Sequence, residues 1–178
     1  MLVDHLVDRG YKHIGLITSS CVGISSIEER ERGFYERIAA HHLKTYENCP
    51  AELKLDMICN TGKAITERNI KTISEYLKKY STLDSLVCLE GGFLSDVYEA
   101  CRRLGLKIPE DIAICSFDED HASPTGYFFN HVKQDEIAIA EKAMELIDGL
   151  LKGENEGKIG NYKIPGIFRE GKSVKQRA

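Results

Sequence analysis

The sequence lacks the features of several large classes of protein. Lys and Arg number 24 against 28 Asp and Glu, for a formal net charge of -4, so no basic excess is available to bind nucleic acid. No apolar run approaches the roughly 18 residues of a membrane span. The first residues, Met1–His5, carry an acid where a secretory signal carries positive charge. The sequence therefore predicts a protein that is neither secreted nor inserted into a membrane and that does not bind DNA by itself.

The cysteines lack the spacing of a zinc site or a redox pair. There are six, and none belongs to a C-x-x-C pair: Cys21, Cys49, Cys59, Cys88, Cys101 and Cys115. Four of them lie within apolar or amphipathic runs, which is typical of buried thiols in a reducing compartment. We therefore expect a cytoplasmic location.

Motifs for catalysis and for nucleotide binding are absent as well. The chain has no G-x-G-x-x-G fingerprint, no phosphate-binding lysine loop and no G-x-S-x-G elbow. Its six histidines have no recognisable nucleophile partner, and Gly91-Gly92 alone is more typical of a turn. These absences predict a protein that is not an enzyme and holds no cofactor.

What the 178 residues do contain is an alternation of short β-branched runs with longer stretches of helical periodicity. This alternation predicts an α/β fold with a doubly wound parallel sheet. The expected strands are residues 13–18, 54–59, 86–89, 112–117, 128–133 and 162–168. The expected helices open the chain before Gly10, follow a capping box at Ser26-x-x-Glu29, include Ile70 to Leu77, and cover 94–104 and 137–151. We expect the tail, 172–178, to be frayed.

In an open parallel sheet, ligands bind beyond the carboxyl ends of the strands. Arg30 falls in this region, near the start of a helix, where a cation is unexpected. One interpretation is a solvated or ion-paired arginine, and the other is a guanidinium fork that donates to ligand oxygens.

The acidic run Asp118–His121, which follows the expected strand 112–117, allows two further interpretations. A metal site is disfavoured because consecutive loop residues seldom converge on one ion, so we expect no metal. A phosphoacceptor aspartate, as in a receiver domain, would need further acids at the end of the first strand. Residues 18–21, Thr-Ser-Ser-Cys, supply none.

One long run points to a known family. The residues Leu104–Asp118, LGLKIPEDIAICSFD, resemble the lac and galactose repressor family of bacterial transcription regulators. Four shorter segments resemble parts of the same family in the same order: HLVDRGYKHIG from His5, Arg30-x-x-Gly33, Val132-Lys133-Gln134 and IPGIFRE from Ile164. Together they cover nearly the whole chain.

The resemblance implies two lobes of the periplasmic-binding-protein type I fold that close on an effector. A helix-turn-helix DNA reader, the domain that binds the operator, would precede the lobes, and the protein would assemble as a homodimer. Residues 1–132 would form the second lobe, 133–157 a return helix of the first lobe, 158–171 the closing strand and 172–178 the tail. The reader and most of the first lobe would be absent, so the chain looks like a truncated product that reaches its DNA operator only through the missing part. We expect such a chain to bind its effector weakly.

By position, the resemblance assigns effector binding to Arg30 and Asp118, which should face one hollow at the same edge of the sheet. Arg30 would bind hydroxyls or a carboxylate, and Asp118 would accept hydrogen bonds from sugar hydroxyls. Glu90 stands where the family commonly has Asn, and Phe93 is a candidate for stacking on a sugar ring. The expected ligand is a small molecule, most simply a carbohydrate. The alternatives are the solute-binding component of a transporter and, third, a receiver-like domain.

The expected return helix carries an apolar stripe that includes Ile137, Ala140, Met144 and Ile147. Without the first lobe this stripe would be exposed, and exposed apolar surface favours association. We therefore expect the helix to pack on a neighbouring chain or against its own sheet.

Overall fold

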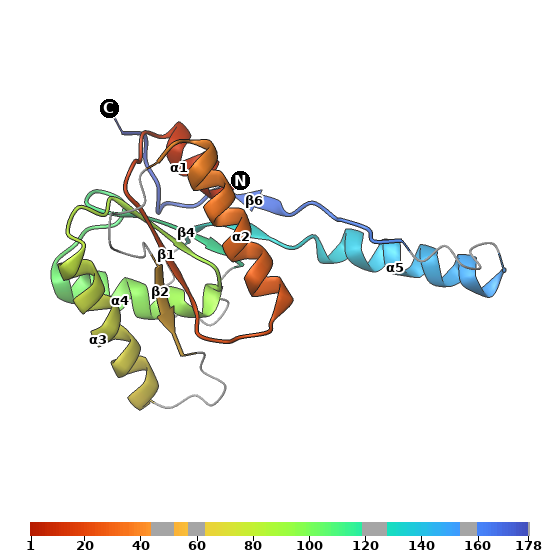
Figure 1. The fold of residues 1–178 in the computed structure, drawn as a ribbon, viewed down its shortest axis with the longest axis horizontal. Coiled ribbons are helices and arrows are strands. Elements are labelled where there is room, and N and C mark those ends of the chain that lie inside the picture. The colour runs from red at the N-terminus through yellow and green to blue at the C-terminus, as the bar shows by residue number, and fades with distance from the viewer. Residues whose placement is uncertain (44–51, 57–62, 119–127, 154–159, 178) are drawn as a thin grey trace.

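The computed structural model describes residues 1–43, 52–56, 63–118, 128–153 and 160–177. The described strands form one six-stranded sheet in the order β2-β1-β3-β4-β5-β6 (Figure 1). The first five strands are parallel, and β6 is antiparallel to β5. Their bounds are β1 Ile14–Ser19, β2 Glu52–Leu55, β3 Ser85–Cys88, β4 Ala113–Phe117, β5 Asn130–Lys133 and β6 Ile167–Arg169.

Helices cover both faces of this sheet, which confirms the predicted doubly wound α/β fold. The helices are α1 Leu2–Asp8, α2 Ser25–Ala40, α3 Lys63–Lys79, α4 Leu94–Leu104 and α5 Glu136–Leu151, with a short 3-10 turn, η1, at Gly91–Phe93. Helices α3 and α4 pack on one face with a core that includes Ile73, Leu86 and Val97. Helices α1 and α2 pack on the other face with Leu6, Leu16 and Phe34.

The strand sequences explain why both faces are covered. In β1, Leu16 belongs to the core under α1 and α2, whereas its neighbour Ile17 belongs to the core under α3 and α4. Every residue of β1 is buried, as expected for a parallel strand between two helical layers. The same alternation places Val87 and Cys88 of β3 in opposite cores.

Two predicted helix ends can be compared directly with the structure. The predicted helix 94–104 is α4, and Gly105 ends it in the left-handed conformation at φ 73°. The predicted capping box is wrong. Helix α2 begins two residues earlier than this box implies, after Ile24, so Ser26 lies inside the first turn, and the structure shows no side-chain cap there. Instead, the Glu28 carboxylate accepts a hydrogen bond from the Gly23 N–H at 3.1 Å.

The strand bounds differ by more at two predicted strands. The second strand is Glu52–Leu55, and residues 57–59 of the prediction lie outside the described residues. The last strand is restricted to Ile167–Arg169, because the residues before it run alongside α5. There the Tyr162 ring lies 4.7 Å from the Lys142 ammonium, and Pro165 has no N–H to donate to a ladder.

The carboxyl-terminal segment is packed, which corrects the prediction of a frayed tail. The buried Ser173 donates its backbone N–H to Asn130 Oδ1 at 3.1 Å and its hydroxyl to the Ile114 carbonyl. Arg177 pairs with Asp84 at 3.0 Å. These bonds attach residues 173–177 to the strands, whereas a sequence of mostly polar residues gave no sign of burial.

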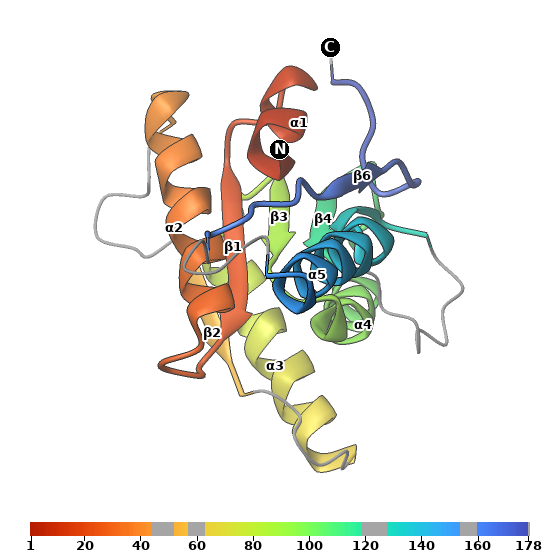
Figure 2. The ribbon, with the colours of Figure 1, turned by 90° about the vertical axis from the view of Figure 1, so that its right-hand side faces the viewer.

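Helix α5 extends away from the sheet (Figure 1), and Figure 2 looks along it toward β1, β3 and β4. Most of its side chains are exposed, including Ile137 at 73%, Met144 at 64% and Ile147 at 49%. The helix therefore does not pack against its own sheet. Packing on a neighbouring chain stays a prediction.

Candidate functional site

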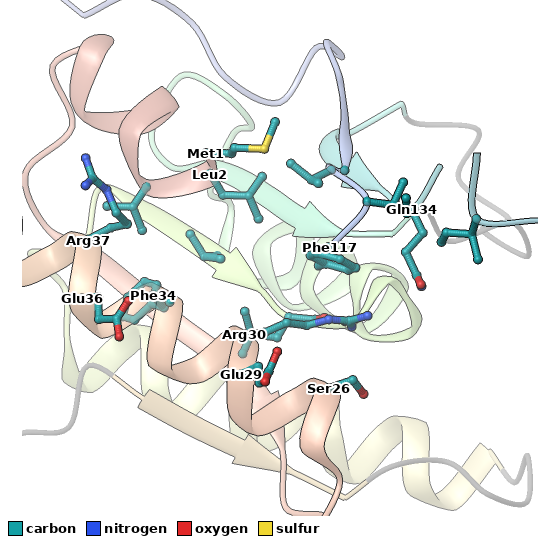
Figure 3. A pocket seen from close by; sticks show the side chains of 18 residues that line it. Met1, Leu2, Ser26, Glu29, Arg30, Phe34, Glu36, Arg37, Phe117 and Gln134 are labelled. Atoms are coloured by element: carbon teal, nitrogen blue, oxygen red, sulfur yellow. The ribbon is translucent and has the colours of Figure 1, made fainter. Parts of the chain in front are cut away.

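A hollow of about 570 Å³ lies on the face of the sheet that α1 and α2 cover, and it extends to the carboxyl ends of β3, β4 and β5. Helices α1 and α2 bound it on one side, and the start of α5 and the segment before β6 bound it on the other (Figure 3). Apolar side chains dominate its floor, among them Val87, Leu89, Phe117 and Val132. A small number of polar side chains lines it as well: Ser26, Glu29, Arg30, Glu36, Arg37 and Gln134.

Helix α2 presents Arg30 to this hollow. Arg30, Phe34 and Arg37 recur at helical spacing and all line it. The Arg30 guanidinium carbon lies 3.6 Å from the centroid of the Phe117 ring, and Nη1 donates to the Leu89 carbonyl oxygen at 2.9 Å. These contacts fix the plane of the guanidinium at the edge of the sheet.

Asp118 approaches Arg30 from the end of β4. Its Oδ2 lies 3.6 Å from Arg30 Nη2, and its side chain is 39% exposed against 18% for Arg30. The backbone of Asp118 is left-handed, with φ 63°, a conformation that costs a non-glycine residue about 1–3 kcal/mol. Two bonds hold it there: the Asp118 N–H donates to the Val132 carbonyl, and the Ser116 hydroxyl donates to the Asp118 carbonyl, both at 2.8 Å.

The structure therefore brings Arg30 and Asp118 together at one edge of the sheet, next to the hollow. Arg30 is part of the lining of the hollow. Asp118 is not part of the lining, and it contacts this region through its ion pair with Arg30. Burial lowers the pKa of Arg30, and the charges of Asp118 and Glu90 oppose that change. The guanidinium consequently remains a charged donor.

Glu90, at the end of β3, is placed differently from the sequence-based expectation of a ligand contact. Both carboxylate oxygens are buried and lack a well-formed hydrogen bond within the described residues, and the same holds for the hydroxyl of Ser19. Burial raises the pKa of Glu90, and the neighbouring Ser19 offsets part of this rise. Glu90 therefore lies near Arg30 but is not part of the lining of the hollow.

Phe93 is also not brought to the hollow. Its ring is 3% exposed and belongs to the core under α3 and α4. The reason is that η1 leads directly into α4, which turns the ring inward. The aromatic rings at the hollow are Phe34 and Phe117 instead, and Phe117 is already covered on one face by Arg30.

Phe117, Gln134 and Ser26 are among the lining residues that the sequence reasoning missed. Phe117 ends the strand inside the long repressor-like run, Gln134 closes the Val-Lys-Gln segment and Ser26 was read as a helix cap. The first two could have been found from their places at strand ends. Ser26 could not, because serine near a helix start usually serves as a cap.

Among the described residues, no group of three or more His, Cys, Asp or Glu side chains is arranged so that it could hold a metal ion. Residues 119–121 of the acidic run lie outside the described residues. Among the helices that the structure describes, none has the length and apolarity to span a membrane.

The comparisons with known proteins agree on one family. The periplasmic binding protein-like domain matches residues 3–174. Over 115 residues the chain is 24% identical to the HTH-type transcriptional regulator GalR of Salmonella typhimurium, a match that covers 65% of this chain and 31% of that regulator.

The same architecture recurs in solved structures of regulators. The lac repressor dimer bound to operator and the anti-inducer ONPF superposes with a TM-score of 0.76 at 17% identity, covering 97% of this chain and 56% of that one. A PurR family regulator from Vibrio parahaemolyticus gives 0.74 at 18%, covering 97% and 59%. A LacI family regulator from Enterococcus faecium with bound ribose gives 0.73 at 16%, covering 99% and 62%. The chain thus spans about a third of the curated relative and somewhat over half of each solved chain.

A doubly wound lobe with an apolar hollow and an arginine fork at the carboxyl ends of its strands is typical of domains that bind small molecules. The chain belongs to the periplasmic binding protein-like domain family, and the relatives that it resembles above are transcriptional regulators.

Proposed function

We propose that this chain forms one lobe of an effector-binding domain and that a sugar or similar polyol binds over Arg30 without being turned over. The observation that carries the proposal is the Arg30 guanidinium, held against Phe117 and Leu89 at the edge of a hollow of about 570 Å³. Rigid donors and acceptors of this kind recognise ligand hydroxyls.

The lobe assignment rests on α5. Residues 1–132 would form the second lobe, α5 would belong to the first lobe, and the segment from 158 would return to the sheet as β6. The exposed Ile137 and Met144 support this division, because an apolar helix face normally packs on other protein. The whole regulator would form a homodimer and bind its operator through a separate reader, as the relatives' names suggest. The four described cysteines are free thiols, which supports a cytoplasmic location.

In such a regulator the effector would favour one arrangement of the two lobes, and its differential affinity would shift DNA binding. The solute-binding alternative is not favoured, since the relatives above are transcription regulators. A coding sequence upstream of Met1 with a helix-turn-helix would support the regulator, and a secretory leader there would support the transporter.

The binding test is a sugar screen by thermal shift and calorimetry on the regulator that carries both lobes, with this chain in parallel. We expect a neutral sugar to bind the two-lobed protein and to bind this chain weakly or undetectably. Arg30→Ala should weaken binding by tenfold or more, or about 1.4 kcal/mol. The matched control Arg32→Ala, also on α2 but 65% exposed, should leave it unchanged. Equal binding by the Arg30 variant would refute the site.

A further inference from the structure

A second hollow, also of about 570 Å³, lies at the amino ends of the strands, at the opposite edge of the sheet from Arg30. We call it the amino-edge hollow. It is bounded by the turn between α1 and β1, by Asp84 just before β3, by the loop after α4 and by the segment 175–177. Every side chain in its lining is polar, whereas apolar side chains dominate the floor of the hollow at Arg30. The two hollows therefore suit different ligands.

Three contacts fix the Arg177 guanidinium at the amino-edge hollow. Its carbon lies 4.8 Å from the centroid of the Tyr11 ring, and its Nη1 donates to Asp84 Oδ2 at 3.0 Å. The backbone N–H of Arg177 donates to the Arg9 carbonyl at 2.9 Å. Its Nε and Nη2, by contrast, have no hydrogen-bond partner in the part of the chain that the structure describes. These two nitrogens point the same way and can donate to two oxygens of one phosphate or carboxylate.

The acid that pairs with Arg177 already has its hydrogen bonds. Asp84 accepts from the backbone N–H groups of Lys12 and His13, at 3.0 and 3.1 Å, and from the Ser85 hydroxyl at 3.1 Å. Arg177 is its fourth donor. Because a carboxylate offers about four lone-pair sites, Asp84 has none left for a lysine side chain, and its charge is balanced by Arg177.

Two lysines bring positive charge to the amino-edge hollow. Lys12 and Lys175 line it and are exposed. Among the described residues, neither ammonium group has an ion pair or a hydrogen bond. The acid in the lining that faces them, apart from Asp84, is the exposed Glu110, so positive charge is in excess. This excess is local, because the chain as a whole has a formal net charge of -4.

A simpler role for these lysines is to neutralise the carbonyl groups at the end of α1. Those carbonyl groups already have partners. The Leu6 carbonyl accepts from the Arg9 N–H at 3.1 Å, and the Val7 carbonyl accepts from the Gly10 N–H at 2.9 Å. The end of α1 therefore does not account for the two ammonium groups.

We propose that the amino-edge hollow is a second binding site, which takes a small oxyanion of the phosphate class, either inorganic phosphate or the phosphate group of a small monoester. Arg177 donates from Nε and Nη2 to two oxygens of the anion, and Lys12 and Lys175 pair with its remaining charge. The bound anion links the segment 175–177 to the start of β1. The proposal is independent of the proposed function, since the two hollows share no lining residue among those that the structure describes.

The experiment titrates this chain with inorganic phosphate and with methyl phosphate, each against sodium chloride of equal ionic strength, and follows the thermal unfolding midpoint and the amide signals in heteronuclear NMR. Either probe should raise the midpoint beyond the chloride reference, and should shift the signals of Lys12 and of residues 175–177 but not that of Arg30. Tighter binding of methyl phosphate would assign the monoester as the ligand, and tighter binding of phosphate the free ion. No saturable response to either probe would overturn the site, and so would shifts confined to Arg30 and its neighbours.

Variants at exposed positions make the result specific, because they should leave the fold intact. Lys12→Gln and Lys175→Gln should weaken phosphate binding by about threefold each and about tenfold together, since each removes one charge beside the anion. Arg177→Lys keeps the charge but removes the fork, and should also weaken binding. Glu110→Gln should strengthen it. The matched control is Lys172→Gln, which removes the same charge from an exposed position outside the lining and should leave binding unchanged. Unchanged binding by the double lysine variant, or an equal loss in the control, would refute the proposal.

Discussion

Each of the two edges of the sheet holds a buried carboxylate near an arginine. The hydrogen bonds of that carboxylate are formed at only one of the two edges. At the amino ends of the strands, Asp84 accepts hydrogen bonds from the backbone N–H groups of Lys12 and His13, at 3.0 and 3.1 Å, and pairs with Arg177 at 3.0 Å. At the carboxyl ends, Glu90 has no well-formed hydrogen bond within the part of the chain that the structure describes, and Arg30 donates there to the Leu89 carbonyl alone. A structural ion pair has its hydrogen-bond partners within the protein, whereas a binding site leaves some donors and acceptors without one.

The strongest test of this contrast removes the acid from each edge. Asp84→Ala should lower the free energy of unfolding by about 3–5 kcal/mol, because it leaves two amides and Arg177 without their acceptor. Asp118→Asn should cost less than about 1 kcal/mol, because the ion pair is long and partly exposed and asparagine tolerates the left-handed backbone at this position. Urea denaturation of both variants measures the difference. Equal losses would show that the two edges play the same structural role.

A second test addresses residues 173–177, which pack at the amino ends of the strands. Ser173→Ala should cost about 1–3 kcal/mol, since the Asn130 N–H and the Ile114 carbonyl lose a buried partner. Gln176→Ala, an exposed neighbour, should change stability by less than about 0.5 kcal/mol. Chemical denaturation checks both, and a neutral Ser173→Ala would mean that the tail is detached in solution.

A third test uses pH at the incomplete edge. Burial raises the folded-state pKa of Glu90, so its contribution to stability is greatest below the ordinary value of 4.5 and is lost as the pH rises through the raised value. Glu90→Gln removes the buried charge and should stabilise the chain by about 1 kcal/mol at pH 7. The gain should shrink toward pH 4. A gain that is independent of pH between 4 and 7 would contradict the assignment.

The smallest effect on the free energy of unfolding should come from α5, whose side chains are mostly exposed. Ile147→Glu should change the free energy of unfolding by less than about 0.5 kcal/mol. The same change should lower any self-association of the chain, since it places a charge on the exposed apolar face. Sedimentation velocity compares it with Glu145→Gln on the opposite face, and association that survives Ile147→Glu would exclude this face as the contact.

The fold was more predictable than the site, for a physical reason. Periodicity reports which faces are buried, so the strand at Ala113–Phe117 and the helix at Leu94–Leu104 followed from apolar spacing and a terminal glycine. The burial of Ser173 depends on distant strands that accept its bonds. No local pattern encodes such a contact.

The site was predictable only in part. Arg30 and Asp118 followed from their places at a helix start and a strand end, and the structure brings them within 3.6 Å of each other. The burial of the Glu90 carboxylate and the inward turn of Phe93 depend on how η1 joins α4. Residue type and spacing do not reveal which way a side chain points when an extra turn precedes the helix.

The excursion of the chain through α5 starts and ends on adjacent strands. It leaves from β5 and returns to β6, which pair with each other at Val132 and Phe168. The backbone of Val132 holds the Asp118 amide, and Gln134 and Gly166, on the outgoing and incoming stems, line the hollow. Because the Val132 carbonyl accepts the Asp118 N–H, a displacement of the β5 and β6 stems by α5 would reach the backbone of Asp118 through a single peptide group.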